Sequence, residues 1–216
     1  MRMRTLFVCA VLMMPPILSA QTAERSRTEG IKETERFIKS GGETTEAVQN
    51  AKLQIRKTLD AYNALVTQPS KNMKGDYKKL MKSADAMQDR VMEARHKVDE
   101  MQTAGDAYFA GRAGTVKNIQ DPELQKRAQG RLDESHKQFG AVLTSLREAA
   151  QTLEPFRRSL SDQITYLGSD LTPSAMTSLK PNAEKVNDRG SKVFADTDHA
   201  VGTATAYFDG LRSAES

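Results

Sequence analysis

The sequence contains no tryptophan and one cysteine, and aromatic residues make up only 6% of its 216 residues. So few aromatic side chains argue against a surface on which single-stranded nucleic acid stacks. Cys9 is the only cysteine and lies close to the start, so the later chain has neither disulfides nor thiolate chemistry. Runs of alternating β-branched residues are also missing, which argues against β-strands. What remains is a sequence rich in helix-forming residues.

The first twenty residues, MRMRTLFVCAVLMMPPILSA, have the layout of a secretory signal peptide. Arg2 and Arg4 precede an apolar run from Leu6 to Met14, and small residues end the segment at Ala20. The run is shorter than the roughly 20 residues that a membrane-spanning helix needs. We expect residues 1–20 to be removed and residues 21–216 to form one secreted or periplasmic domain with no transmembrane span. An uncleaved anchor is the alternative.

Charged residues are mixed along the chain, with 32 basic and 28 acidic side chains. Because Arg2 and Arg4 leave with the leader, the net charge of the mature chain is about +2. Interspersed charges of both signs are typical of a solvated surface. They predict no nucleic-acid footprint, which would gather lysine and arginine on one face.

Apolar residues recur every 3.5 residues, which is the pattern of helices that pack along one seam. In the second candidate helix the seam positions are Met73, Tyr77, Leu80, Ala84, Met87, Val91, Ala94, Val98, Met101, Gly105 and Tyr108. In the third they are Leu132, Ser135, Phe139, Val142, Leu146, Ala149, Leu153, Phe156, Leu160, Gln163 and Leu167. Similar repeats cover residues 48–66 and 179–211, and the last of these has an unusually small seam.

These repeats predict an all-α fold, an elongated antiparallel up-and-down bundle of four helices with coiled-coil packing. Two of the helices should have about 45 residues each, or about 70 Å. The glycine pair Gly41-Gly42 is expected to separate a short leading piece from the first helix. A three-helix bundle with a loosely attached first helix is therefore the alternative.

The predicted corners have recognisable capping residues. Asp121 is expected to cap the start of the third helix, Ser70 that of the second and Thr172 that of the fourth. Gly168 is expected to end the third helix in a left-handed conformation, and Pro173 to begin the fourth. Pro155 and Pro181 fall inside helices and should kink them.

The corner between the last two helices carries the most specific pattern in the chain. Glu154-Pro155 is followed by DQITYL at residues 162–167, then by Leu171 and a restarting helix at residues 175–179. This pattern resembles an uncharacterised bacterial envelope family known as domain of unknown function 2959, over residues 30–212. The resemblance implies a helical bundle with coiled-coil character and no known activity. The chain departs from the family at residues 168–170, where Gly-Ser-Asp replaces a Lys-His-Asn type of turn.

Five residues of this corner form the candidate interaction site, namely Asp162, Gln163, Tyr166, Gly168 and Pro173. Gln163 stands out because it occupies a seam position, where a buried amide must be hydrogen-bonded. Such a residue usually fixes the register of packed helices. The other interpretation is a ligand-binding notch formed by Asp162, Gln163 and Tyr166.

The three histidines provide no persuasive metal site. His96, His136 and His199 fall at similar heights in the folded bundle, but none occupies a seam position. We expect solvated imidazoles rather than zinc ligands. Nucleophile motifs, phosphate-binding loops and cofactor motifs are missing as well, so the sequence predicts no cofactor and no enzyme.

The favoured function is a protein–protein interaction or scaffold module that binds a protein partner or itself. Long bundles present extended helical faces, which suit partner helices. A periplasmic holdase chaperone is one alternative and would need an exposed apolar patch. A peripheral membrane-binding protein is another and would need lysine and arginine beside exposed apolar residues.

Overall fold

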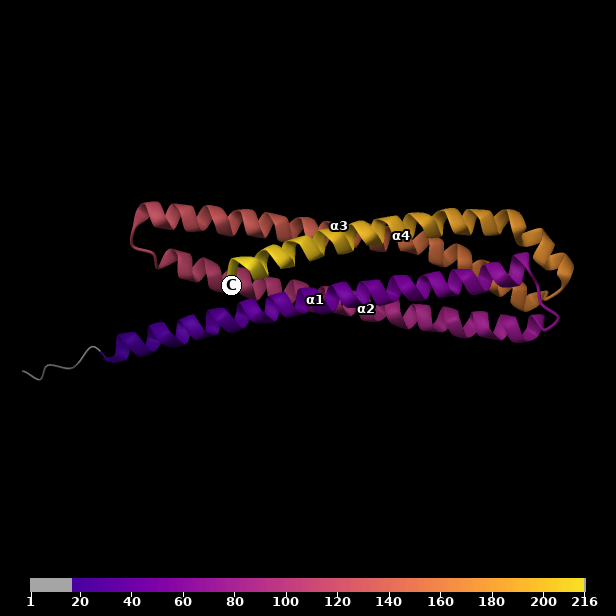
Figure 1. The fold of residues 1–216 in the computed structure, drawn as a ribbon, viewed down its shortest axis with the longest axis horizontal. Coiled ribbons are helices and arrows are strands. Elements are labelled where there is room, and N and C mark those ends of the chain that lie inside the picture. The colour runs from indigo at the N-terminus through magenta and orange to yellow at the C-terminus, as the bar shows by residue number, and fades with distance from the viewer. Residues whose placement is uncertain (1–16, 216) are drawn as a thin grey trace, which may run out of the picture.

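The computed structural model describes residues 17–215, with side chains from residue 28 to residue 214. The predicted leader lies outside the described residues as far as residue 16. Four helices make up the described chain: α1 (Ile17–Thr67), α2 (Met73–Lys117), α3 (Pro122–Ser169) and α4 (Pro173–Glu215). They run up and down along one axis in an elongated bundle (Figure 1). No strand occurs in residues 17–215, so the all-α prediction is confirmed.

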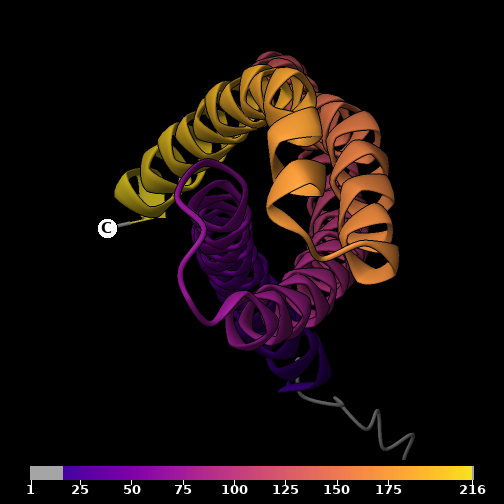
Figure 2. The same ribbon diagram turned by 90° about the vertical axis from the view of Figure 1, so that its right-hand side faces the viewer.

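The helices form a closed ring when the bundle is viewed from its end (Figure 2). α1 has its most extensive contacts with α2, α3 packs on α4, and α1 also packs on α4. The contact between α2 and α3 is the sparsest of the four. α1 contributes Phe37, Ile55, Tyr62 and Leu65 to the core. The alternative of a loosely attached first helix is therefore wrong.

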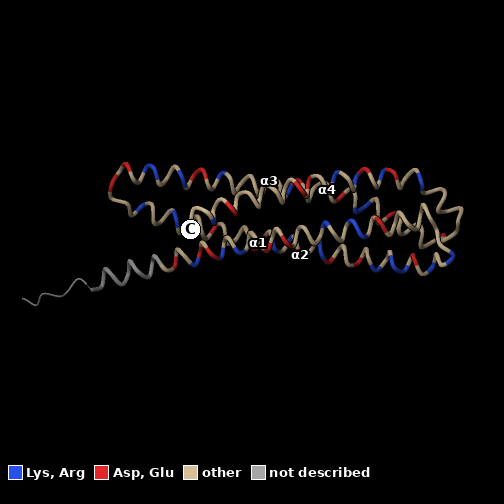
Figure 3. Tube along the Cα trace, viewed as in Figure 1, with Lys and Arg blue, Asp and Glu red and all other residues tan. Residues whose placement is uncertain are grey.

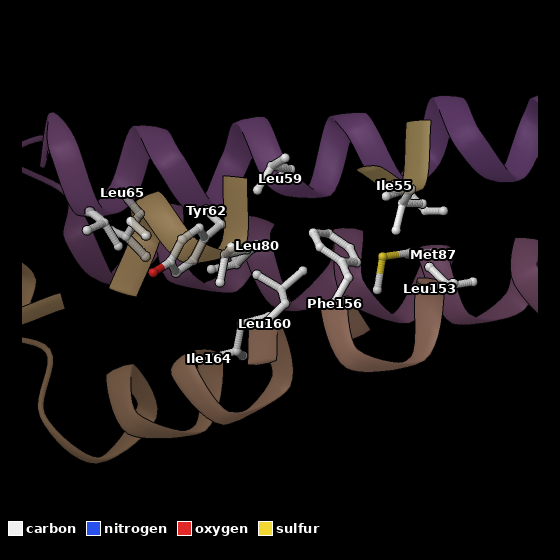
Figure 4. Packing of buried hydrophobic residues seen from close by; sticks show 14 of the residues in the cluster. Ile55, Leu59, Tyr62, Leu65, Leu80, Met87, Leu153, Phe156, Leu160 and Ile164 are labelled. Carbon is white, nitrogen blue, oxygen red and sulfur yellow. The ribbon is translucent and has the colours of Figure 1, made fainter. Parts of the chain in front are cut away.

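The core follows the predicted 3.5-residue seams. None of the eleven seam positions of α2 or of α3 is exposed. One cluster of buried residues fills the end of the bundle where α3 meets α4, and Figure 4 shows Tyr62, Leu80, Phe156 and Leu160 within it. A second cluster fills the other half of the bundle. Burial of these apolar seams is the main force that holds the helices together.

Aromatic rings dominate the second cluster. Phe37 of α1 lies at its centre, with ring centroids of four neighbours on the other helices between 4.9 and 5.9 Å away. These neighbours are Tyr108, Phe109, Phe139 and Phe208. Most of these pairs meet edge to face, which is a favourable arrangement for aromatic quadrupoles. With Tyr207, which packs on Phe139 and Phe208, these residues make up six of the twelve phenylalanines and tyrosines of the sequence.

The glycine pair in α1 does not interrupt the helix, contrary to the prediction. α1 continues through Gly41 and Gly42 with no positive φ angle at either residue. A Cβ atom on Gly41 would lie 2.4 Å from the ring of Phe208, whereas one on Gly42 would meet nothing within 4 Å. Gly41 therefore serves packing, because it lets the Phe208 ring lie against the backbone of α1.

Two of the three predicted N-terminal caps are confirmed. The carboxylate of Asp121 accepts hydrogen bonds from the backbone N–H groups of Glu123 and Leu124, both at 2.9 Å. Thr172 accepts one from Ala175 N–H at 3.3 Å. Ser70 is not the cap of α2, because Asn72 occupies that position and accepts from Gly75 N–H at 3.1 Å. Ser70 instead accepts from the N–H of Asn72 and so fixes the loop.

The two internal prolines are tolerated within continuous helices. Pro155 lies inside α3 and Pro181 inside α4. The orange first turns of α4 bend away from the rest of that helix, as predicted for a proline near its start (Figure 1).

Candidate functional site

The corner between α3 and α4 is short, and hydrogen bonds hold its two ends together. α3 ends at Ser169, and α4 begins at Pro173, whose fixed φ suits the first position of a helix. Asp170 caps α3 in an extended conformation, and its N–H donates to the carbonyl of Tyr166 at 3.1 Å. The hydroxyl groups of Tyr166 and Ser178 lie 3.4 Å apart and link the two helices just inside the corner.

Gln163 is buried and bridges three helices. Its Oε1 accepts a hydrogen bond from the hydroxyl of Tyr62 on α1, and its Nε2 donates to the carbonyl of Asn182 on α4 at 3.5 Å. Its side chain is only 7% exposed. Because a buried amide must find such partners, only one axial register of these helices satisfies it. These contacts fit the register-setting interpretation.

Tyr62 is fully buried beside Gln163, and burial raises the pKa of its hydroxyl to about 12. The phenol therefore stays protonated and keeps donating to Gln163 across the whole neutral range. A second amide pair, Asn63 of α1 with Asn187 of α4, lies nearby with distances of 2.7 and 3.1 Å. Polar side chains thus lock α1 against both α3 and α4 at this end of the bundle.

Asp162 and Tyr166 lie on the outside of α3. Tyr166 is 42% exposed. Asp162 borders a shallow surface groove of about 330 Å³ that also contains Arg158 and Arg189. The structure therefore separates the predicted notch residues, with Gln163 inside the bundle and the other two on its surface.

Gly168 does not have the role expected of it. It lies within α3 with a negative φ angle, so the predicted left-handed cap is wrong. A Cβ atom at this position would lie 2.5 Å from the hydroxyl oxygen of Tyr77, which donates to the carbonyl of Ile164 at 3.2 Å. The glycine therefore leaves room for the Tyr77 hydroxyl to reach α3. This contact between α2 and α3 cannot be predicted from the turn-forming residues in the sequence.

A second feature that the sequence did not predict lies halfway along the α2–α3 seam. Arg95 of α2 pairs with Glu154 of α3 at 2.6 Å, and Arg147 of α3 donates to the amide oxygen of Gln102 at 3.4 Å. Hydrogen bonds from Arg95 and then Arg157 hold the pKa of the Glu154 carboxyl below its ordinary value. We call the gap framed by these two bridges the α2–α3 slot. In the sequence, the only sign of this slot is that Arg95 and Arg147 lie outside the seam positions.

The three histidines are all exposed, as expected. His96 lies 3.4 Å from the carboxylate of Glu100, and the ring of His136 packs on Phe109 with centroids 4.6 Å apart. Within the described part of the chain, no group of three histidine, cysteine, aspartate or glutamate side chains is placed to hold a metal ion. No helix of that part is long and apolar enough to cross a membrane.

Comparison with known proteins places the chain in a family. It matches the family described as "Protein of unknown function (DUF2959)" over residues 22–211, which includes nearly all of the four helices. No curated protein and no solved structure matches the chain. The resemblance carried by the α3–α4 corner is thus confirmed, and the chain belongs to the DUF2959 family.

Proposed function

We propose that this protein is a non-enzymatic interaction module of the bacterial cell envelope, which binds a protein partner through the outer face of its bundle. The leader-like segment at residues 1–20 supports the location. The polar layer at Gln163 supports the role, because it fixes the helices in one register and so holds the outer faces in constant positions.

One observation carries the proposal, namely a pair of exposed methionines on α2. Met81 is 38% exposed and Met92 is 52% exposed. Eleven residues separate them, which is about three helical turns, so both point to the same side about 16 Å apart. Single exposed apolar residues are common on any protein, and the polar residues Asp85 and Gln88 lie between these two on the same side of α2. Two methionines on one helix face can still serve as two anchors for a partner helix. Methionine also adapts its shape to a partner at little cost.

Scattered charges fit a protein ligand better than a membrane surface. Blue and red segments are interspersed along the described parts of all four helices in Figure 3, and no helix carries one sign alone. A membrane-binding face would combine lysine and arginine with an apolar stripe. A holdase would need a contiguous apolar patch, whereas the large exposed apolar side chains of the described chain are six separate residues.

The test is crosslinking of the mature protein in intact cells, followed by mass spectrometry of the attached proteins. A photoreactive residue at position 92 reports the proposed face, and one at Leu53, which is 54% exposed on α1, is the matched control. We expect one dominant partner at position 92 and little capture at position 53. Equal capture of many unrelated proteins at both positions would instead support the holdase.

A further inference from the structure

Halfway along the bundle, between the two core clusters, lies an apolar cavity of about 310 Å³. All four helices contribute to its walls, including Ala51 and Ile55 of α1, Ala94 of α2, Ala149 of α3 and Val193 of α4. The alanines explain the cavity, because three helices present a small side chain at the same level. Ligand pockets in proteins begin at about 300 Å³, so the space is at the lower end of that range.

The cavity reaches the surface at the α2–α3 slot. Arg95, Asp99, Gln102 and Arg147 border the cavity as well as the solvent. The Arg95–Glu154 bridge and the Arg147–Gln102 bridge are seven residues apart on each helix, which is about 10 Å. α2 and α3 also make the sparsest contact of the bundle, so this seam can admit a ligand with the least loss of packing.

The charges at the mouth favour an anion. Arg95 and Arg147 border the cavity at the slot with one carboxylate, that of Asp99, whereas Lys52 borders its opposite wall, where α1 packs on α4. Arg95 and Lys52 already have carboxylate partners, Glu154 and Asp198. Arg147 contacts only the neutral amide of Gln102 among the described side chains, at the long distance of 3.4 Å. A guanidinium held at an apolar opening and paired with a neutral group is suited to receive a carboxylate or phosphate.

We propose that the cavity binds the alkyl chain of a single-chain amphiphile, with its anionic head at Arg147 in the α2–α3 slot. At about 30 Å³ for each water-sized group, the cavity has room for roughly ten such groups, so a chain of about ten carbons matches it. Neither Met81 nor Met92 lines this cavity, so the proposal does not depend on the proposed protein partner.

The proposal is tested by isothermal titration calorimetry of the full mature protein with decanoate, decyl phosphate and uncharged decanol. Decanoate and decyl phosphate distinguish a carboxylate head from a phosphate head. We expect saturable one-to-one binding of at least one of the two anions, tighter than that of decanol, and a higher melting temperature of the protein with the bound anion. No saturable heat with either anion, or equal affinity for decanol, would overturn the proposal.

Three variants and two controls locate the site. Ala149→Leu fills the cavity and should weaken anion binding at least about tenfold, while Ala61→Leu enlarges a half-buried alanine outside it and should not. Arg147→Gln should reduce the preference for the anion over decanol, and exposed Arg127→Gln is its control. Circular dichroism checks that each variant is folded, and Ala94→Leu is a second cavity-filling variant. Unchanged binding in folded Ala149→Leu or Ala94→Leu would place the ligand elsewhere and contradict the proposal.

Discussion

At the scale of single residues, the buried pair of Tyr62 and Gln163 joins α1 to α3 by a hydrogen bond, and we infer that it helps to set how the helices align. Gln163→Leu would leave the Tyr62 hydroxyl buried without its acceptor. We expect this change to lower the free energy of unfolding by about 1–3 kcal/mol. Adding Tyr62→Phe removes the unsatisfied hydroxyl and should recover much of the loss. Urea unfolding of the two single variants and the double variant measures the coupling, and strictly additive losses would show that the pair is not formed.

Because two tyrosine hydroxyls are buried, the free energy of unfolding should depend on pH in the alkaline range. Burial raises the pKa of Tyr62 and of Tyr207 to about 12, against about 10 for a tyrosine in the unfolded chain. Between these values the unfolded chain loses phenolic protons that the folded chain keeps. The stability should therefore be unaffected by these groups below pH 10 and should fall as the pH rises from 10 to 12, by about 1.4 kcal/mol for each unit of pKa shift.

Urea unfolding at several pH values between 9 and 11.5 checks this dependence. Tyr62→Phe removes one of the two groups, so its free energy of unfolding should fall less steeply over the same interval. An identical slope in the variant and the native protein would show that the Tyr62 phenol ionises as readily when folded as when unfolded.

At the scale of elements, neighbouring glycines of α1 should respond in opposite ways to alanine. Gly42→Ala meets open space and should stabilise the helix by about 0.5–1 kcal/mol, since alanine is the better helix former. Gly41→Ala gains the same propensity but forces the Phe208 ring out of place, and overpacking of a core costs about 1–3 kcal/mol. We expect a net loss of stability for Gly41→Ala. Thermal unfolding of both variants tests this prediction. An equal gain in stability for Gly41→Ala and Gly42→Ala would show that the Phe208 ring can move aside without cost.

These glycines also show which features of the fold the sequence could predict and which it could not. The heptad seams were predictable because apolar burial repeats at the helical period, and Asp121 and Thr172 were predictable because a cap needs only local geometry. Gly41 and Gly168 were misjudged because their role depends on Phe208 and Tyr77, which are distant in the sequence. Glycine's low helix propensity does not predict a helix break where a neighbouring side chain packs in the space that a Cβ atom would occupy.

The corner site was predicted in part for the same reason. A polar residue on an apolar seam predicts a buried hydrogen bond, and Gln163 forms one with Tyr62 and a second, part-buried one with Asn182. Its partner Tyr62 lies 101 residues away, and local patterns carry no information about which helix supplies it. The α2–α3 slot depends likewise on pairs such as Arg95 and Glu154, which only the fold brings together.

At the scale of the whole molecule, the bundle should be a rod in solution. α2 has 45 residues and is therefore about 68 Å long. A compact protein of 216 residues would have a radius of gyration of about 17 Å. Small-angle X-ray scattering of the mature protein should give a clearly larger value and the profile of an elongated particle. A value near 17 Å would indicate that the helices fold back into a shorter arrangement.

The central claim is that the protein acts by binding a partner protein on the outside of α2. The most direct measurement uses a lysine-reactive crosslinker in intact cells, which leaves positions 53 and 92 free for substitution. It compares recovery of the crosslinked partner from cells that carry Met81→Gln together with Met92→Gln, or Leu53→Gln as the control. All three side chains are exposed, so each variant should fold normally. The account predicts that the methionine variant loses most of the partner and that the control keeps it. Equal recovery from both variants would contradict the claim.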